Sequence, residues 1–246
     1  SANWMWPAKN KGENARLYNA VEALSDFVIK LGINIPTGKD SLSMTQKYPD
    51  GKIVYSPGTV IISAVGEVED IQKCITPVLK QKEGTKIVYI DFSKSDFELG
   101  GSSFAQTLNI LGKRVPDVTD AAYFAKAFNT VQQLISDEKI LAGHDISSGG
   151  LITTLLEMNF SNLGYGMDLN LDCFGDEDLV RIMFSENPGI VVQLENEDEV
   201  VNVLKKNNIT YHILGSVIND FIIKLHKEKK EYVLDIERLR DIWFET

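Results

Sequence analysis

The chain has 246 residues, 43% of them hydrophobic and 24% charged, a composition that allows one large globular domain or two smaller ones. Its net charge of −10 argues against a general nucleic-acid binder, although it leaves a nucleotide ligand open. No apolar run reaches the roughly 18 residues of a membrane span. The distant Cys74 and Cys173 form neither a zinc motif nor a disulfide framework, so we expect a cytoplasmic protein. The charge and the absence of a long apolar run predict that it binds neither nucleic acid nor membrane.

The first eighty residues combine one helix with short β-rich stretches. Apolar residues recur at helical spacing over residues 14–31, and Gly32 then provides a C-cap that ends the helix. The other elements expected here are strands at 33–36, 52–55 and 59–68, a polar loop at 37–44 and a connector at 70–82.

From residue 84 the pattern changes to alternating helices and strands. Helices are expected at 103–111, 123–136, 151–160, 176–183 and 197–207. Strands are expected at 86–91, 140–142, 189–194, 212–218, 221–225 and 232–236, with an edge strand at 166–171. The expected fold class is α/β in the mixed (α+β) sense, with an incomplete β-rich unit followed by an α/β unit.

The most informative segment is His-Asp-Ile-Ser-Ser-Gly-Gly at residues 144–150, which leads from an apolar run into a helix. A glycine-rich turn before a helix suits a phosphate group, because the helix dipole favours negative charge and glycines allow close approach. Asp145 offers the oxygen donor that Mg²⁺ prefers. The alternative is that Ser147 or Ser148 merely caps the helix. Likewise, His144 is either a general acid or base or a packed histidine bonded to backbone.

Three other segments carry polar groups. Thr-Gly-Lys-Asp-Ser-Leu-Ser at 37–43 offers Lys39, Asp40 and Ser41 but is not a Walker A loop, because the first glycine is missing. Gly100, Gly101 and Ser102 enter a helix, where a serine cap and a phosphate contact are both possible. In Ser-Glu-Asn-Pro-Gly at 185–189, Glu186 is the ionisable candidate beside a turn. These groups indicate a phosphate and magnesium binder rather than a covalent catalyst.

Five segments in order resemble the second half of phosphoribosylformylglycinamidine synthase in its large, single-chain form. They are Ser-Ala-Asn-Trp-Met-Trp at 1–6, Pro-Thr-Gly-Lys-Asp-Ser-Leu-Ser-Met at 36–44, Gly-Gly-Ser at 100–102, and the motifs at 144–150 and 185–189. The resemblance implies an AIR-synthetase-like fold. Residues 1–82 would be a partial β-barrel-forming N-terminal domain with its connector, and residues 83–246 a complete α/β C-terminal domain.

Both ends of the chain read as cuts within a longer polypeptide, because two tryptophans stand at the start and an uncapped amphipathic pattern at the end. The resemblance implies that the missing partners are a first AIR-synthetase-like half and a C-terminal glutaminase domain. Alone, the chain is expected to be inactive.

The resemblance also implies an activity, an ATP-dependent C–N ligation in purine biosynthesis that converts formylglycinamide ribonucleotide, glutamine and ATP to the amidine. Its cofactors would be Mg²⁺ and ATP or ADP. Asp145 matches the family's magnesium ligand and Ser147 its nucleotide contact. Further metal ligands, a Glu and an Asn, would precede residue 1. Ile146 and Ser148 stand where the family often has Arg and Asp, which removes one acidic group near the phosphates.

The remaining candidates for a substrate-facing cleft are Lys39, Asp40, Ser41, Gly100, Gly101, Ser102 and His144. One alternative function is a non-catalytic module of the same fold that holds a nucleotide or acts as a scaffold. AIR synthetase itself fits less well, because the Trp-Met-Trp opening and the Gly-Lys-Asp-Ser loop speak against it.

Overall fold

The computed structural model describes residues 1–68, 70–161 and 164–245, and the chain divides into two compact units, residues 1–69 and 70–246. We expected the boundary after residue 82. The connector at 70–82 instead belongs to the second unit, because Leu79 is only 1% exposed and joins that unit's core. Its N–H also donates to the Met158 carbonyl at 2.9 Å.

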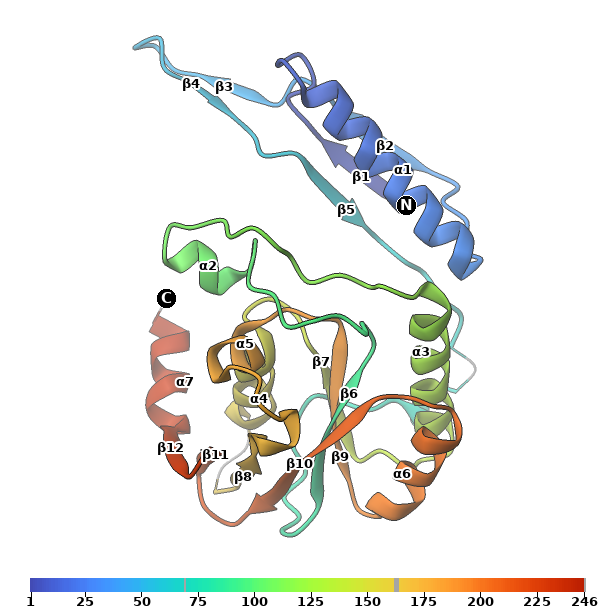
Figure 1. The fold of residues 1–246 in the computed structure, drawn as a ribbon, viewed down its shortest axis with the longest axis vertical. Coiled ribbons are helices and arrows are strands. Elements are labelled where there is room, and N and C mark those ends of the chain that lie inside the picture. Colours follow the sequence, from blue (N-terminus) through green and yellow to red (C-terminus); the bar gives the residue numbers. More distant parts are fainter. Residues whose placement is uncertain (69, 162–163, 246) are drawn as a thin grey trace. The chain divides into compact units, whose positions relative to one another are not determined.

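The first unit consists of a three-stranded sheet, one long helix and a separate hairpin (Figure 1). The sheet has the order β2-β1-β5, in which β1 runs parallel to β2 and antiparallel to β5. Its elements are β1 (Ala2–Met5), α1 (Glu13–Leu31), β2 (Gly38–Ser41), β5 (Thr59–Ile62) and the hairpin strands β3 (Thr45–Lys47) and β4 (Ile53–Tyr55). Gly32 ends α1 in the left-handed conformation, as predicted.

Two strand predictions in this unit were wrong. Residues 33–37 have no regular structure, and the expected loop after them contains β2, which carries Lys39, Asp40 and Ser41. The reason is β1, which the sequence pattern did not reveal and which supplies the partner strand. The strand expected at 59–68 ends at Ile62, where its pairing with Ala2 ends.

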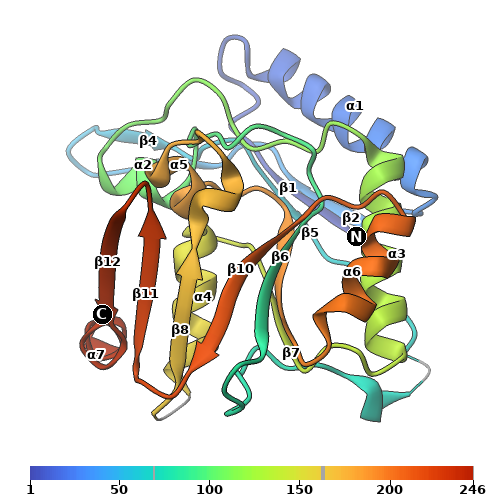
Figure 2. The ribbon, with the colours of Figure 1, turned by 60° about the horizontal axis from the view of Figure 1, so that its bottom comes forward.

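The second unit is built on a seven-stranded mixed sheet with the order β12-β11-β8-β10-β6-β9-β7 (Figure 2). Neighbouring strands are antiparallel except for β8 and β11, which are parallel. The strands are β6 (Lys86–Asp91), β7 (Ala142–Asp145), β8 (Gly166–Asn170), β9 (Gly189–Leu194), β10 (Tyr211–Ile218), β11 (Ile222–Lys227) and β12 (Lys230–Asp235).

Helices cover both faces of this sheet (Figure 1). Along β6, Ile87 and Tyr89 belong to the cluster with α4, while Val88 and Ile90 belong to the cluster with α3 and α6. This alternation places one core on each side of the strand. The helices are α2 (Ser103–Thr107), α3 (Ala121–Ser136), α4 (Gly150–Phe160), α5 (Leu179–Phe184), α6 (Glu197–Lys206) and α7 (Ile236–Glu245), with 3-10 turns at Ile71–Lys73 and Leu171–Phe174.

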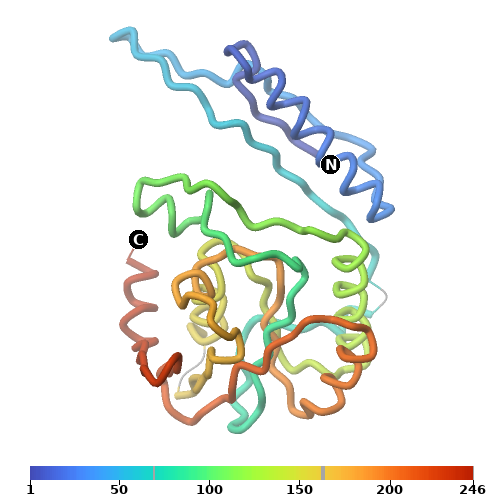
Figure 3. The backbone as a smooth tube through the Cα atoms, in the orientation of Figure 1, coloured from blue at the N-terminus to red at the C-terminus, as the bar shows by residue number. Residues whose placement is uncertain are grey.

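The sequence placed some elements of the second unit incorrectly. The strand at 166–171, expected at an edge, is interior, because β11 pairs with it on its outer side. The short strand expected at 140–142 is β7, which extends to Asp145 and so includes His144. The helix expected at 103–111 ends at Thr107, and Figure 3 traces the long irregular segment that connects it to α3. In the described part of the chain, no helix is long and apolar enough to cross a membrane.

Candidate functional site

The turn between β7 and α4 exposes the two residues predicted to meet a metal and a nucleotide. Asp145 ends β7 with its side chain 76% exposed, and Ser147 is also exposed. Ile146 between them is buried and belongs to the core cluster that includes α4. The alternation therefore leaves a carboxylate and a hydroxyl open to a ligand, while Ile146 fixes the turn to the core.

The backbone of this turn is held firmly. The Asp145 carbonyl accepts a hydrogen bond from Thr154 Oγ1 at 3.0 Å and lies 2.9 Å from His144 Nδ1. The Ile146 N–H donates to the Gly189 carbonyl at 2.9 Å. His144 Nε2 lies 3.1 Å from Glu157 Oε2 on α4. His144 thus joins β7 to α4, and an acid–base role for it stays a prediction.

Two consecutive glycines then begin α4. Gly149 and Gly150 have φ values of 90° and 75°, in the region that glycine adopts without strain. A Cβ on Gly150 would also lie 2.8 Å from the carbonyl oxygens of Met183 and Ser185. Gly149 occupies the N-cap position and no side chain caps the helix, so the alternative that Ser147 or Ser148 caps it was wrong. Ser147 contributes its carbonyl instead, which accepts from the Gly150 N–H at 3.0 Å.

The first N–H of this helix start is bound by a carboxylate from elsewhere in the chain. Glu186 Oε1 accepts from the Gly149 N–H at 2.9 Å and from the Ser103 N–H at 2.8 Å. The two glycine–serine turns are therefore neighbours. An internal anion already occupies the Gly149 amide, whereas the side chains of Asp145 and Ser147 are exposed to solvent.

The structure explains why residues 100–102 are two glycines and a serine. Ser102 caps α2 by accepting from the Ala105 N–H at 3.2 Å, which confirms the capping alternative. Gly100 and Gly101 donate to the carbonyls of Arg114 and Leu111, at 2.8 and 2.7 Å. A Cβ on Gly100 would lie 2.2 Å from the Arg114 oxygen, so only glycine permits this pairing.

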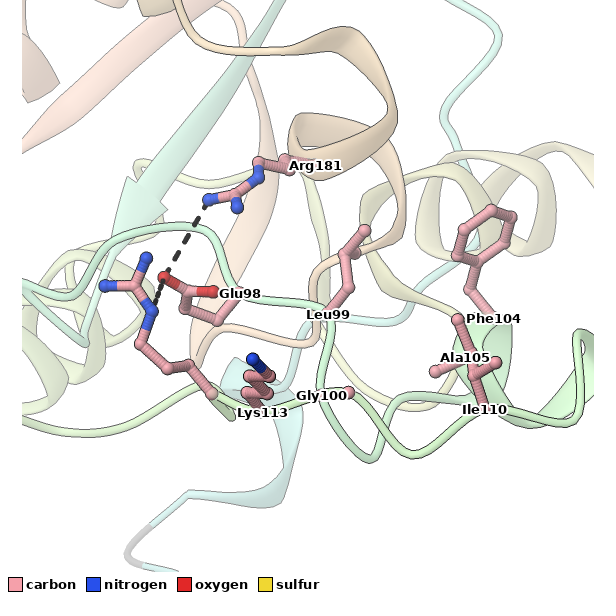
Figure 4. Close-up of a pocket in the computed structure, with 10 residues that line it drawn as sticks. Glu98, Leu99, Gly100, Phe104, Ala105, Ile110, Lys113 and Arg181 are labelled. Atoms are coloured by element: carbon pink, nitrogen blue, oxygen red, sulfur yellow. Dashed lines mark ion pairs between the residues drawn. The ribbon is translucent and has the colours of Figure 1, made fainter.

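A pocket of about 330 Å³ lies beside Gly100 (Figure 4). The buried Glu98 points into it, with Oε1 3.1 Å from Arg114 Nε and 3.8 Å from Arg181 Nη1. Lys113 forms another part of the wall. One carboxylate among three cations makes the pocket positively charged.

The candidates in the first unit lie on β2. Lys39 Nζ donates to Ser41 Oγ at 2.8 Å, and the side chains of this strand reach solvent. They belong to one unit and the Asp145 turn to the other, so their approach to a shared cleft stays a prediction.

The donors at the Asp145 turn fit Mg²⁺ as one contributor among several. Within residues 1–68, 70–161 and 164–245, no group of three or more His, Cys, Asp or Glu side chains could hold a metal ion. Mg²⁺ commonly takes only one or two carboxylates, however, and completes its shell with phosphate oxygens and water. The exposed Asp145 carboxylate fits that role, with phosphates as the main ligands.

Partial burial shifts the pKa of one thiol and one imidazole in the second unit. It raises the pKa of the Cys173 thiol to about 11 and lowers the pKa of His212, whose Nδ1 lies 3.1 Å from the Cys173 carbonyl. The thiolate is the nucleophilic form of cysteine, so Cys173 is a poor nucleophile.

Glu186 is the residue that sequence reasoning left out of the site. The sequence indicates Glu186 as an ionisable residue beside the turn at residues 185–189. No local pattern, however, places residue 186 beside residues 103 and 149, because that proximity depends on how β9 and α4 pack.

The fold and the turn define a class: an α/β unit with a sheet covered on both faces, preceded by a β-rich unit. Residues 82–228 match the family model of the AIR synthase related protein C-terminal domain, and residues 1–67 match that of the FGAR-AT PurM_N-like domain. The chain belongs to the family of AIR synthase related proteins, as its motifs predicted.

Among similar proteins, the probable phosphoribosylformylglycinamidine synthase, chloroplastic/mitochondrial, of Arabidopsis thaliana is 39% identical over 251 aligned residues. That alignment covers 100% of this chain but 18% of the plant protein. Solved structures share the fold. T. maritima PurL complexed with ATP has a TM-score of 0.63 at 12% identity, covering 97% of this chain and 37% of that one. E. coli HypE, a hydrogenase maturation protein, has a TM-score of 0.57 at 12% identity, covering 96% and 72%.

Proposed function

We propose that this chain is part of an ATP-dependent C–N ligase, phosphoribosylformylglycinamidine synthase, that acts in purine biosynthesis. The reaction would convert formylglycinamide ribonucleotide, glutamine and ATP to formylglycinamidine ribonucleotide. The observation that carries the proposal is the 39% identity to the plant synthase along the whole chain. Solved T. maritima PurL structures complexed with ATP, ADP and FGAR have the same fold, which supports a nucleotide ligand.

Within that enzyme, the turn after β7 would hold a magnesium nucleotide. Asp145 would supply one oxygen to Mg²⁺, and the Ser147 hydroxyl would donate to a phosphate oxygen. When bound, the metal neutralises phosphate charge. The chain's own contribution is rigidity, because Thr154 and His144 fix the Asp145 carbonyl and Ile146 is anchored in the core. Lys39, Asp40 and Ser41 would contribute from the first unit.

The proposed partners are a first AIR-synthetase-like half, which would supply the missing metal ligands, and a glutaminase domain, which would supply ammonia. A cytoplasmic location is part of the proposal and rests on the two free cysteines. The alternative, a non-catalytic module of the same fold that holds a nucleotide or acts as a scaffold, is less well supported, because the identity to the plant synthase extends along the whole chain.

The test is an assay of ADP release that depends on formylglycinamide ribonucleotide, with ammonia as nitrogen source. We expect turnover by the complete polypeptide and none by residues 1–246 alone. A complete polypeptide that binds nucleotide but shows no substrate-dependent ADP release would support the non-catalytic alternative. Turnover by the 246-residue chain above the no-enzyme blank would contradict the division of the site between this chain and its partners.

A further inference from the structure

One oxygen of Glu186 bonds two amides that are distant in the sequence. Its partners, the N–H groups of Ser103 and Gly149, lie 83 and 37 positions away. Gly149 has no side chain and stands at the N-cap of α4, so Glu186 caps that helix from outside. The same atom also binds the first N–H of α2. A single carboxylate therefore joins the starts of two helices.

The segment that carries Glu186 is itself fixed on both sides. Ser185 is 2% exposed, and its hydroxyl donates to the Glu98 carbonyl at 2.9 Å. Asn187 is 1% exposed, and its amide donates to the carbonyls of Ser95 and Asp96, both at 3.1 Å. The carboxylate is consequently presented from a rigid backbone.

The two hydrogen bonds from the Ser103 and Gly149 N–H groups to Glu186 Oε1 are called the bridge below. Both the charge and the length of the Glu186 side chain matter for it. A bond from N–H to a carboxylate is roughly twice as strong as one to a neutral acceptor, and a helix start favours negative charge. Glutamine at this position keeps the length and one acceptor oxygen but loses the charge. Aspartate keeps the charge but withdraws the carboxylate by about 1.5 Å, one carbon–carbon bond. Since both bonds are already 2.8–2.9 Å long, aspartate cannot keep the two together.

The bridge lies two residues from the proposed nucleotide contact. Gly149 follows Ser147 and Ser148, and the Gly150 N–H closes this turn on the Ser147 carbonyl. Release of Gly149 would free the end of the turn that carries Ser147, while the Asp145 end stays anchored by Thr154. Displacements of about 1 Å are enough to weaken a bound ligand's contacts strongly.

We propose that Glu186 is a positioning residue, which fastens the Asp145–Ser147 turn to the start of α2 and thereby sets the geometry of the nucleotide site without touching the nucleotide. The second part rests on the proposed function. The first part concerns the fold of this chain alone, so the two can fail separately.

The experiment compares Glu186→Ala, Glu186→Asp and Glu186→Gln with Glu83→Gln, which alters an exposed carboxylate of the same unit. Amide hydrogen exchange in the 246-residue chain, without nucleotide, reports on the Gly149 and Ser103 N–H groups. The β6 amides report whether each variant is folded. ADP retained by the complete polypeptide is measured after denaturation.

In Glu186→Ala we expect exchange at Gly149 and Ser103 to rise roughly tenfold, the effect of losing a charge-assisted bond, with β6 unchanged. Retained ADP should fall at least as far in Glu186→Ala as in Glu186→Asp. Glu186→Gln should restore part of the amide protection and part of the retained ADP. Glu83→Gln should match the parent.

If the Gly149 and Ser103 amides of Glu186→Ala exchange at the same rate as in the parent, the proposed bridge is contradicted. If exchange is faster in Glu186→Ala but the retained ADP equals that of the parent, the link between the bridge and the nucleotide site is contradicted. A parent polypeptide without ADP would instead contradict the proposal that the turn after β7 holds a magnesium nucleotide, and the exchange readout would still decide the bridge. If Ala also loosens β6, the comparison of Asp and Gln with the parent decides the proposal, because Gln preserves side-chain volume.

Discussion

The two units differ in where their apolar residues lie. In the second unit, clusters of buried side chains pack on both faces of the sheet, and strands such as β6 and β9 are almost wholly buried. In the first unit, the buried cluster consists of Ala2, Trp4, Trp6 and Ala8. Its long helix α1 has no fully buried residue, and Ile61 on β5 is 52% exposed. The second unit thus has a core of its own, whereas the first leaves much apolar surface open in this chain.

This difference bears on the proposed site. The Asp145 turn and Glu186 are mounted on elements that belong to the two-sided core, so their geometry is set within the second unit. Lys39, Asp40 and Ser41 lie on a strand of a small sheet, and such sheets gain stability mainly when another layer packs on them. We therefore expect the Asp145 turn in the second unit and the β2 candidates in the first unit to respond differently to mutation.

The largest expected effect is at Leu155, a residue of α4 that is 1% exposed. Leu155→Ala should lower the free energy of opening of the β6 and β9 amides by about 2–5 kcal/mol, because it removes buried methyl groups and leaves a cavity. The measurement is native-state hydrogen exchange.

The matched substitution in the first unit is Ile61→Ala. It should change the β6 and β9 values by less than about 0.5 kcal/mol, since the Ile61 side chain is half exposed and lies in the other unit. Equal losses from the two substitutions would show that the units unfold as one, which contradicts the comparison.

A smaller effect, confined to the first unit, is expected at Gly38. A Cβ there would lie 2.3 Å from the Ala2 carbonyl oxygen, so Gly38→Ala should disturb the pairing of β1 with β2 at a cost of about 1–3 kcal/mol. In a Trp243→Phe background, the emission of Trp4 and Trp6 should shift to longer wavelength.

Gly66→Ala is the control for that substitution, because a Cβ at Gly66 would meet no heavy atom within 4 Å. Its emission should equal the parent's. An unchanged spectrum in Gly38→Ala would mean that the β1–β2 contact does not hold the tryptophans in place.

Local sequence patterns predicted the strands and helices whose buried residues form a continuous apolar run or a regular apolar stripe. The bounds of β6 and β9 follow directly from continuous apolar runs, and α3 from its apolar stripe. They failed where pairing decides the structure. β1 is a strand because β2 and β5 lie beside it, and β8 is interior because β11 pairs with it.

The same limit applies to the site. Asp145 and Ser147 were predicted because a motif holds them two residues apart, and alternation around the buried Ile146 exposes both. The role of Glu186 was missed because two bonds across 37 and 83 positions create it. Such contacts depend on packing in three dimensions, which a local pattern does not contain.

The most direct test of the account is the ADP content of the complete polypeptide, determined by chromatography after denaturation. We expect the parent to release bound ADP and Asp145→Asn to release little, with a lower melting temperature, because a ligand that binds the native state stabilises it. Asp176→Asn, which alters an exposed carboxylate in the same unit, should retain the parent's content. Equal ADP per chain in the parent and in Asp145→Asn would contradict the role assigned to Asp145.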